Sequence, residues 1–354
     1  MELVLATDAW LPQVNGVVRS LSTTVQRLTA RGNRVDVIAP DRFLTVPMPG
    51  YAAIRLAVSP RFGVRRMLDR AAPQLVHIAT EGPIGWAARG WCLSRGVPFT
   101  SAFHTRFPDY AAVRTGMSPA MFWPILERFH RPSSAVLVST ESLARELAGH
   151  GIGPTLRWSR GIDHDLFQPH GPRHAAMAAL PGPVLLNVGR VAAEKNLEAF
   201  LDAPVAGSKV VVGDGPALPA LRRRYPDATF LGALHGEELA SAYRASDCFV
   251  FPSRTDTFGL VIIEALACGL PVAALPVTGP LDILGADGQG DDGFLTRPAG
   301  ALCDDLASAI ARALSLGRAD AAALGARYCW DRATDQFEQA LAVALENRVS
   351  RRAA

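Results

Sequence analysis

Short apolar segments alternate with helix-length segments along the whole chain, and this alternation restricts the fold more than any other feature of the sequence. Strands that are separated by helices form parallel sheets through right-handed crossovers. The expected strands cover residues 3–6, 34–38, 75–78, 99–103 and 135–139, and then 184–188, 209–212, 229–231, 248–251 and 271–274. Since the pattern begins again after a stretch rich in Gly, Pro and His at 160–183, the sequence predicts an α/β protein with two Rossmann-like domains.

Domains of this type bind ligands outside the carboxyl ends of their strands, so we expect the two domains to face each other across a ligand cleft. The length of 354 residues is about twice that of a typical domain. We expect one domain at 1–165, a second at 166–329, and a terminal segment at 330–354 that forms a long helix.

The composition indicates a cytoplasmic protein. No apolar run reaches the roughly 18 residues that a membrane-spanning helix needs. The first residues predict a strand and lack the basic region and cleavage site of a secretion signal. The five cysteines show none of the paired spacing that zinc sites and disulfide frameworks use, so we expect reduced core cysteines and no bound metal.

Positive charge is concentrated in the first half of the chain. Residues 1–168 hold 19 Arg and 12 acids, a net charge of +7, and 169–354 hold 17 Lys or Arg and 21 acids, a net charge of −4, which together give +3. Arginines and apolar side chains share one expected helix, namely Arg61, Phe62, Arg65, Arg66, Met67 and Arg70. This helix is either a solvated face or a contact with an anionic membrane, which would place the protein at the inner face of the cytoplasmic membrane. No nucleic-acid-binding module is recognisable, so nucleic acid is not an expected partner.

The segment 251–271 combines a strand end, a glycine turn and a helix start. We expect a helix to begin at Gly259 and to end near Gly269. Amides at a helix start bind anions, and the helix dipole strengthens the site. Asp256 precedes this helix and Glu264 lies inside it, so both carboxylates can reach one ligand. Amides for a diphosphate beside acids for sugar hydroxyls suggest a nucleotide-sugar site.

Basic and glycine-rich turns follow other expected strands. Arg190 and Lys195 are five positions apart after the strand at 184–188, a spacing suited to gripping a diphosphate, with an ion pair to Glu194 as the alternative. Val212-Gly-Asp-Gly-Pro216 has only part of a dinucleotide fingerprint because Leu218 replaces its third glycine. Gly16 follows the first strand, where a glycine would let the backbone approach a phosphate.

Two further strand ends carry polar side chains. His104 follows the strand at 99–103 with Arg106 and Tyr110 nearby, and we expect the histidine to point into the cleft. Thr80 and Glu81 follow the neighbouring strand at 75–78 and are candidates for contacts with acceptor hydroxyls, although Glu81 has pairing with an arginine as its alternative. We assign Arg106 and Tyr110 to the same acceptor-binding group.

The chain resembles family four of the retaining glycosyltransferases with the GT-B fold, on the motifs at 187–196 and 251–271 and over nearly its full length. The family pattern has Glu at the position of Asp256, so the first carboxylate is one methylene shorter here. The resemblance implies that Gly16, Arg190, Lys195 and the amides of Phe258, Gly259 and Leu260 bind the donor diphosphate. It also implies that Glu264 binds the ribose, that Asp256 and His104 contact the transferred sugar, and that the terminal helix crosses back to the first domain. Asp256, Glu264 and His104 are therefore the expected catalytic residues.

Among the subfamilies, these motifs look most like bacterial α-mannosyltransferases and sulfolipid or diacylglycerol glycosyltransferases. The resemblance implies GDP-mannose as the donor, with UDP-sugars as the alternative, a lipid or glycan acceptor, and no cofactor or metal beyond the nucleotide-sugar. Three other classes stay open: a sugar-nucleotide 2-epimerase, a nicotinamide oxidoreductase, which the incomplete glycine fingerprint disfavours, and a catalytically degenerate nucleotide-sugar-binding scaffold.

Overall fold

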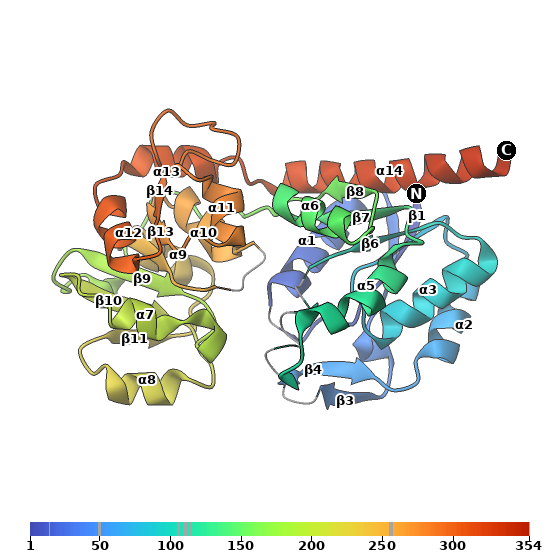
Figure 1. The fold of residues 1–354 in the computed structure, drawn as a ribbon, viewed down its shortest axis with the longest axis horizontal. Helices are drawn as coiled ribbons and strands as arrows, with labels where there is room; N and C mark the ends of the chain where they lie inside the picture. The colour runs from blue at the N-terminus through green and yellow to red at the C-terminus, as the bar shows by residue number, and fades with distance from the viewer. Residues whose placement is uncertain are drawn as a thin grey trace. The chain divides into compact units, whose positions relative to one another are not determined.

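The structure is a computed structural model that describes residues 1–13, 15–48, 51–104, 107–108, 112, 115–254 and 258–353. The chain divides into two compact units (Figure 1). The N-terminal unit consists of Met1–Gly161 together with Trp330–Ala354, and the C-terminal unit consists of Ile162–Cys329.

The N-terminal unit is built on a six-stranded parallel sheet with the order β2-β1-β5-β6-β7-β8. The strands of this unit, including an antiparallel hairpin formed by β3 and β4, are β1 (Glu2–Ala6), β2 (Arg34–Ile38), β3 (Thr45–Met48), β4 (Tyr51–Ala57), β5 (Leu75–Ile78), β6 (Phe99–Ala102), β7 (Ala135–Val138) and β8 (Thr155–Arg157). Its helices are α1 (Gly16–Ala30), η1 (Pro40–Arg42), α2 (Arg61–Ala71), α3 (Pro83–Arg95), η2 (Pro119–Met121), α5 (Trp123–His130), α6 (Glu141–Gly149) and α14 (Trp330–Ala353).

The sheet of the N-terminal unit is apolar on both faces because helices cover both. Successive side chains of a strand point to opposite faces. Along β1, Leu3 and Leu5 therefore pack with residues of α1 and α14, whereas Val4 and Ala6 pack with residues of α2 and α3. This double coverage explains why the strands read as continuous apolar runs in the sequence.

Helix α14 belongs to the N-terminal unit although it follows the C-terminal unit in the chain, and Figure 1 shows it running along α1 and the sheet. Its apolar side chains complete one core cluster: Phe337, Ala340, Leu341 and Ala344. On its polar side, Arg31, which directly follows α1, contacts Asp335 at 2.6 Å and Glu338 at 2.7 Å. These ion pairs are partly exposed, so apolar burial contributes more than they do to holding α14 in place.

The C-terminal unit is built on a second six-stranded parallel sheet with the order β11-β10-β9-β12-β13-β14. Its strands are β9 (Val184–Val188), β10 (Ser208–Val212), β11 (Thr229–Gly232), β12 (Cys248–Phe251), β13 (Val272–Ala274) and β14 (Gly300–Leu302). Its helices are η3 (Ala175–Met177), η4 (Ala193–Lys195), α7 (Leu197–Leu201), α8 (Leu218–Arg224), α9 (Gly236–Arg244), α10 (Leu260–Ala267), α11 (Thr278–Leu284), α12 (Leu306–Ala313) and α13 (Arg318–Gly325).

The two parallel sheets confirm the expected α/β class with two Rossmann-like units, and all ten expected strands are present to within one residue at each end. The strands that the sequence did not predict are β3, β4, β8 and β14. β8 and β14 have three residues each and lie at sheet edges, where fewer apolar side chains are needed. Their sequence signal is correspondingly weak.

All five cysteines are free thiols. Cys92, Cys248 and Cys268 are buried, and burial raises the pKa of each thiol to about 12. These three are inert core side chains, as expected. In the part of the chain that the structure describes, no helix is long and apolar enough to cross a membrane.

Candidate active site

Each sheet has one place where neighbouring strands lead to helices on opposite sides, and ligands of open α/β sheets bind there at the carboxyl edge. In the C-terminal unit this switch point lies between β9 and β12. The loops that follow the two strands are tied together. Asn187 Nδ2 donates to the Val250 carbonyl at 2.9 Å, and Asn196 Nδ2 donates to the Pro252 carbonyl at 3.0 Å. The loop that carries Arg190 and Lys195 therefore lies beside the loop that leads to α10.

Arg190 comes directly after Gly189 at the end of β9, and Lys195 ends the short helix η4 in the same loop. The alternative pairing of Arg190 with Glu194 is present as a long contact, 3.8 Å between Nη1 and Oε1. Both side chains are partly exposed, and exposed ion pairs contribute only about 0–1 kcal/mol. This contact therefore contributes little to holding Arg190 in place.

The Gly-rich turn at 212–216 packs directly beneath this loop. A Cβ atom at Gly213 would lie 1.8 Å from the Gly189 carbonyl oxygen, and the φ of Gly213 is +141°. The Val191 amide donates to the Asp214 carbonyl at 2.9 Å, and the Ala217 amide donates back to Val191 at 3.0 Å. Close backbone packing thus requires Gly213, and this packing places Arg190 at the edge of the sheet.

Helix α10 begins close to the residue that the sequence predicted, at Leu260 directly after Gly259. Gly259 occupies the N-cap position with φ +98°, a left-handed conformation in which glycine costs little. The Phe258 ring is buried and packs edge-on against Tyr328, with ring centroids 5.9 Å apart. Phe258 therefore anchors the loop by its side chain, and the backbone amides of Phe258, Gly259 and Leu260 lie at the start of α10, where the helix dipole favours an anion.

Glu264 lies in α10 and is 1% exposed. Its Oε2 accepts a hydrogen bond of 3.0 Å from the Tyr243 hydroxyl of α9. Asp256, the other expected catalytic carboxylate, lies outside the described residues, as do Arg106 and Tyr110 of the expected acceptor group.

The switch point of the N-terminal unit lies between β1 and β5, and a carboxylate of the protein itself occupies it. Asp8 follows β1 and accepts hydrogen bonds from the Ile84 amide at 2.9 Å and the Gly85 amide at 3.2 Å, at the start of α3. Thr80 donates to the same carboxylate at 3.0 Å and accepts from the Asp8 amide at 2.7 Å. Burial raises the pKa of Asp8 to about 6, against the opposing effect of these hydrogen bonds. The Asp8 carboxylate thus binds the first amides of α3, and the hydrogen bonds of Thr80 help to hold Asp8 in place.

Two other polar residues of this edge, Asn15 and Glu81, also have internal partners. Asn15 accepts from the Val18 amide at 3.0 Å and so caps α1, whose first residue is Gly16. Glu81 Oε1 lies 3.1 Å from His130 Nε2. The alternative partner expected for Glu81 was an arginine, and the structure places a buried histidine there instead.

His104 follows β6 and forms a cluster with two residues beyond β8. Arg160 Nη2 lies 2.8 Å from His104 Nδ1, and the Arg160 guanidinium lies 4.6 Å from the centroid of the Trp158 ring. Burial and the adjacent Arg160 hold the pKa of His104 well below its usual value. Because arginine can only donate, Nδ1 accepts, and the neutral imidazole carries its proton on Nε2. The site residues expected from the sequence do not include Arg160, so its contact with His104 is a finding of the structure.

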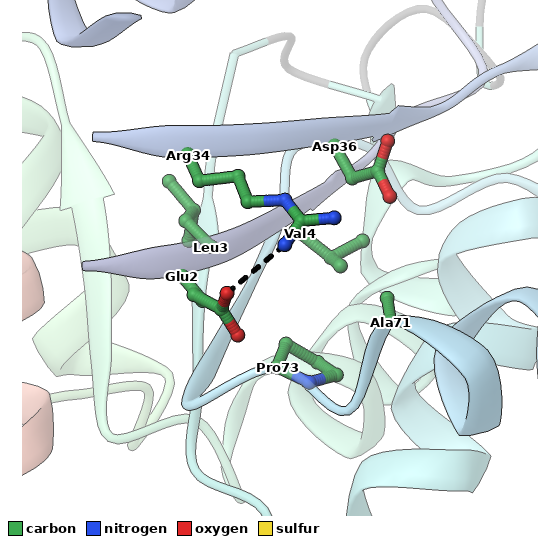
Figure 2. Close-up of a pocket in the computed structure, with 7 residues that line it drawn as sticks. All are labelled: Glu2, Leu3, Val4, Arg34, Asp36, Ala71 and Pro73. Carbon is green, nitrogen blue, oxygen red and sulfur yellow. Dashed lines mark hydrogen bonds and ion pairs between the residues drawn. The ribbon is translucent and has the colours of Figure 1, made fainter. Parts of the chain in front are cut away.

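One pocket that the structure contains lies away from these residues. This pocket of about 20 Å³ is lined by Glu2, Leu3, Val4, Arg34, Asp36, Ala71 and Pro73 (Figure 2). Figure 2 shows the Glu2–Arg34 ion pair, 3.2 Å long, bridging the first residues of β1 and β2, which is the amino edge of the sheet. Ligands of this fold bind at the opposite edge, and 20 Å³ holds about one water molecule. Geometry therefore favours the strand ends over this pocket, and no metal-ligating cluster occurs among the described residues.

Two family models match the chain. One, described as glycosyltransferase family 4, matches residues 14–166, and the other, described as glycosyl transferases group 1, matches residues 182–315. Among curated proteins, the chain is 30% identical to a GDP-mannose-dependent alpha-mannosyltransferase of Mycobacterium tuberculosis, over 80% of this chain and 81% of that protein. It is also 30% identical to a sulfoquinovosyl transferase of Arabidopsis thaliana, over 80% of this chain and 61% of that protein.

Solved structures share the fold. A sucrose-phosphate synthase from Thermosynechococcus elongatus superposes with a TM-score of 0.73 at 22% identity, covering 96% of this chain and 98% of that one. HepE of Anabaena, crystallised with UDP, superposes with a TM-score of 0.69 at 16% identity, covering 97% of this chain and 100% of that one. At these identities the likeness concerns the fold alone.

Proposed function

Because this chain belongs to family 4 of the glycosyltransferases (glycosyl transferases group 1), and is therefore a hexosyltransferase with the GT-B fold, we propose that it transfers mannose from GDP-mannose, with retention of configuration, to a hydroxyl group of a lipid or glycan. Mannosyltransferases among its relatives support the donor. The alpha-monoglucosyldiacylglycerol synthase among the relatives supports a lipid acceptor. A UDP-sugar is the alternative donor.

One observation carries the assignment of the donor to the C-terminal unit. At its switch point, Arg190 and Lys195 lie in the loop beside the start of α10, whose cap position holds a glycine. At the switch point of the N-terminal unit, the Asp8 carboxylate already occupies the amides of α3. A diphosphate is attracted by the first arrangement and repelled by the second.

The chemistry follows from the charge of the leaving group. As the bond between the sugar C1 and the phosphate oxygen breaks, negative charge grows on the diphosphate and the sugar becomes oxocarbenium-like. Arg190, Lys195 and the amides of 258–260 stabilise the diphosphate. The acceptor hydroxyl bonds to C1 on the same face and gives its proton to the leaving phosphate oxygen, which needs no protein nucleophile.

Three side chains orient the donor in this proposal. Glu264 accepts hydrogen bonds from the ribose hydroxyls, and Asp256 accepts them from the sugar hydroxyls. His104, neutral and protonated at Nε2, donates to the transferred sugar. Thr80, Glu81, Arg106 and Tyr110 stay candidates for the acceptor side, with Thr80 and Glu81 acting within the contacts they already make to Asp8 and His130.

A surface of the N-terminal unit supports a lipid acceptor. Leu44 is 85% exposed and Phe62 is 83% exposed. The Val58 amide donates to the Leu44 carbonyl at 2.8 Å, and the Phe43 ring lies against Gly63, so the hairpin and the start of α2 form one surface. Exposed Arg61, Arg65, Arg66 and Arg70 accompany it on α2, whereas Met67 packs against the core. Apolar side chains among arginines fit an anionic membrane.

Calorimetric titration with GDP, UDP and their mannose and glucose conjugates tests the donor site. Nucleotide binding that is lost in Lys195→Ala but kept in Lys209→Met supports the proposed binding of the diphosphate by Arg190 and Lys195. Lys209 is the matched control because it is the other lysine of the chain and its Nζ donates to the Leu201 and Ala203 carbonyls, both at 2.7 Å. Tight binding of UDP with weak binding of GDP would favour a UDP-sugar as the donor. The absence of any nucleotide binding would contradict the proposed donor site. Donor binding without turnover for any lipid or glycan would favour the scaffold.

Sedimentation with vesicles tests the membrane surface. Phosphatidylglycerol vesicles should bind the wild type at low salt, and Arg65→Glu/Arg66→Glu should abolish this binding. Arg222→Glu/Arg223→Glu reverses two neighbouring exposed charges on α8 and should have no effect. Equal binding by both variants, or none by the wild type, would reject the surface.

A further inference from the structure

A tyrosine outside every motif of the sequence analysis touches the carboxylate assigned to the ribose. Tyr243 lies in α9, and its hydroxyl donates to Glu264 Oε2 at 3.0 Å. Both side chains are buried, with Tyr243 at 0% and Glu264 at 1% exposure. A buried carboxylate is costly unless polar partners compensate for the lost water, so this hydrogen bond is part of what allows Glu264 to lie there.

The tyrosine ring is fixed by its neighbours. It packs edge-on against Phe167, with centroids 6.0 Å apart, and at a tilt against Phe249, with centroids 5.8 Å apart. Because these rings are buried in one core cluster, the hydroxyl cannot move away from Glu264 without disturbing the packing. The position of the carboxylate is therefore set from α9 as well as from α10.

We propose that Tyr243 is a positioning residue that holds the Glu264 carboxylate for the ribose hydroxyls, and that it thereby sets the preference of the site for ribonucleotides. This inference rests on the proposed function. A site built to accept hydrogen bonds from a hydroxyl discriminates strongly against a ligand that lacks it, provided that the acceptor is held in place. Removing the Tyr243 hydroxyl should weaken the part of the affinity that depends on the ribose hydroxyls and leave the diphosphate contribution intact.

The test is a calorimetric comparison of GDP and UDP with their 2′,3′-dideoxy forms. Tyr243→Phe should bind the preferred ribonucleotide roughly tenfold more weakly than the wild type does, because one charge-assisted hydrogen bond is lost. Its affinity for the dideoxy form should be unchanged. Tyr225→Phe is the matched control, since the Tyr225 hydroxyl also donates to a carboxylate, that of Asp202 at 2.8 Å, on the surface of α8.

A double variant shows whether Tyr243 acts through Glu264. Tyr243→Phe/Glu264→Gln should bind the ribonucleotide no more weakly than Glu264→Gln alone. Losses of equal size for the ribonucleotide and the dideoxy form, additive losses in the double variant, or no loss at all would overturn the inference while leaving the donor site standing. A wild type that binds no nucleotide would overturn the donor site and this inference with it.

Discussion

Each unit has a topological switch point at the carboxyl edge of its sheet, but the charged side chains at the two points differ in sign. In the N-terminal unit, Asp8 bridges from β1 to the first amides of α3. In the C-terminal unit, Gly259 caps α10, and the neighbouring loop contributes Arg190 and Lys195. The N-cap residue is a glycine in both helices, Gly82 for α3 and Gly259 for α10, so the difference is that the Asp8 carboxylate from a neighbouring strand end binds the first amides of α3. The fold alone therefore does not distinguish the two switch points, and the charged side chains around them are the basis for proposing the donor site in the C-terminal unit.

The largest effect on activity should come from removing a cation at the switch point of the C-terminal unit, between β9 and β12. Arg190→Ala should lower kcat/KM for transfer by about 10²- to 10³-fold, the usual cost of losing one preorganised donor to a developing charge. Arg312→Ala, which removes an exposed arginine from α12, should leave kcat/KM unchanged. Steady-state kinetics with both variants measures the difference in kcat/KM. Wild-type kinetics for Arg190→Ala would contradict the proposed contrast between the two switch points.

The next effect concerns the packing beneath that switch point. In Gly213→Ala the new methyl group meets the backbone carbonyl of Gly189, so we expect a loss of stability of roughly 2–3 kcal/mol and weaker nucleotide binding. Gly90→Ala on α3 is the counterpart in the other unit. Its methyl group meets nothing within 4 Å, so we expect a gain of about 0.5–1 kcal/mol. Urea unfolding of both variants tests the pair, and similar stabilities would contradict it.

The smallest expected effect is the pH dependence of stability that Asp8 causes at the switch point of the N-terminal unit. The pKa of Asp8 in the folded protein, about 6, lies above its ordinary value of 3.8. The folded state therefore holds the proton more tightly than the unfolded state, and the wild type loses stability as the pH rises from about 4 to 6. Asn does not titrate, so the stability of Asp8→Asn relative to the wild type should rise across that window by on the order of 2 kcal/mol.

Denaturant unfolding at pH 4, 5, 6 and 7 measures this change. A constant difference between Asp8→Asn and the wild type would show that burial does not govern the Asp8 carboxyl. A falling difference would show that the amides of α3 outweigh burial and hold the carboxylate in its charged form.

Motifs in the sequence predicted those parts of the candidate site that are local in the chain. The strand at 184–188 and the turn after it fall within one short segment, as do Gly259 and Glu264, so spacing along the chain was enough to find them. The α/β class followed equally directly, because strands buried on both faces read as apolar runs.

Contacts between distant segments left no such signal. Asp8 and the amides of α3 are separated by more than 70 positions, and His130 reaches Glu81 from another helix. Tyr243 looks like one more apolar residue of an amphipathic helix until the structure places its hydroxyl on Glu264. Partners of this kind can be sought as polar side chains near the end of a helix that packs beside the helix carrying the motif.

The return of α14 to the N-terminal unit has a consequence for the order in which the protein matures. During synthesis, the strands and helices of the C-terminal unit emerge before Trp330, whereas the core of the N-terminal unit lacks Phe337 and Leu341 until α14 has been made. The unit that is translated second is therefore the first able to complete its core. Because Ile162–Cys329 is one uninterrupted segment, it is also a piece that recombination can exchange as a cassette while the rest of the chain is kept.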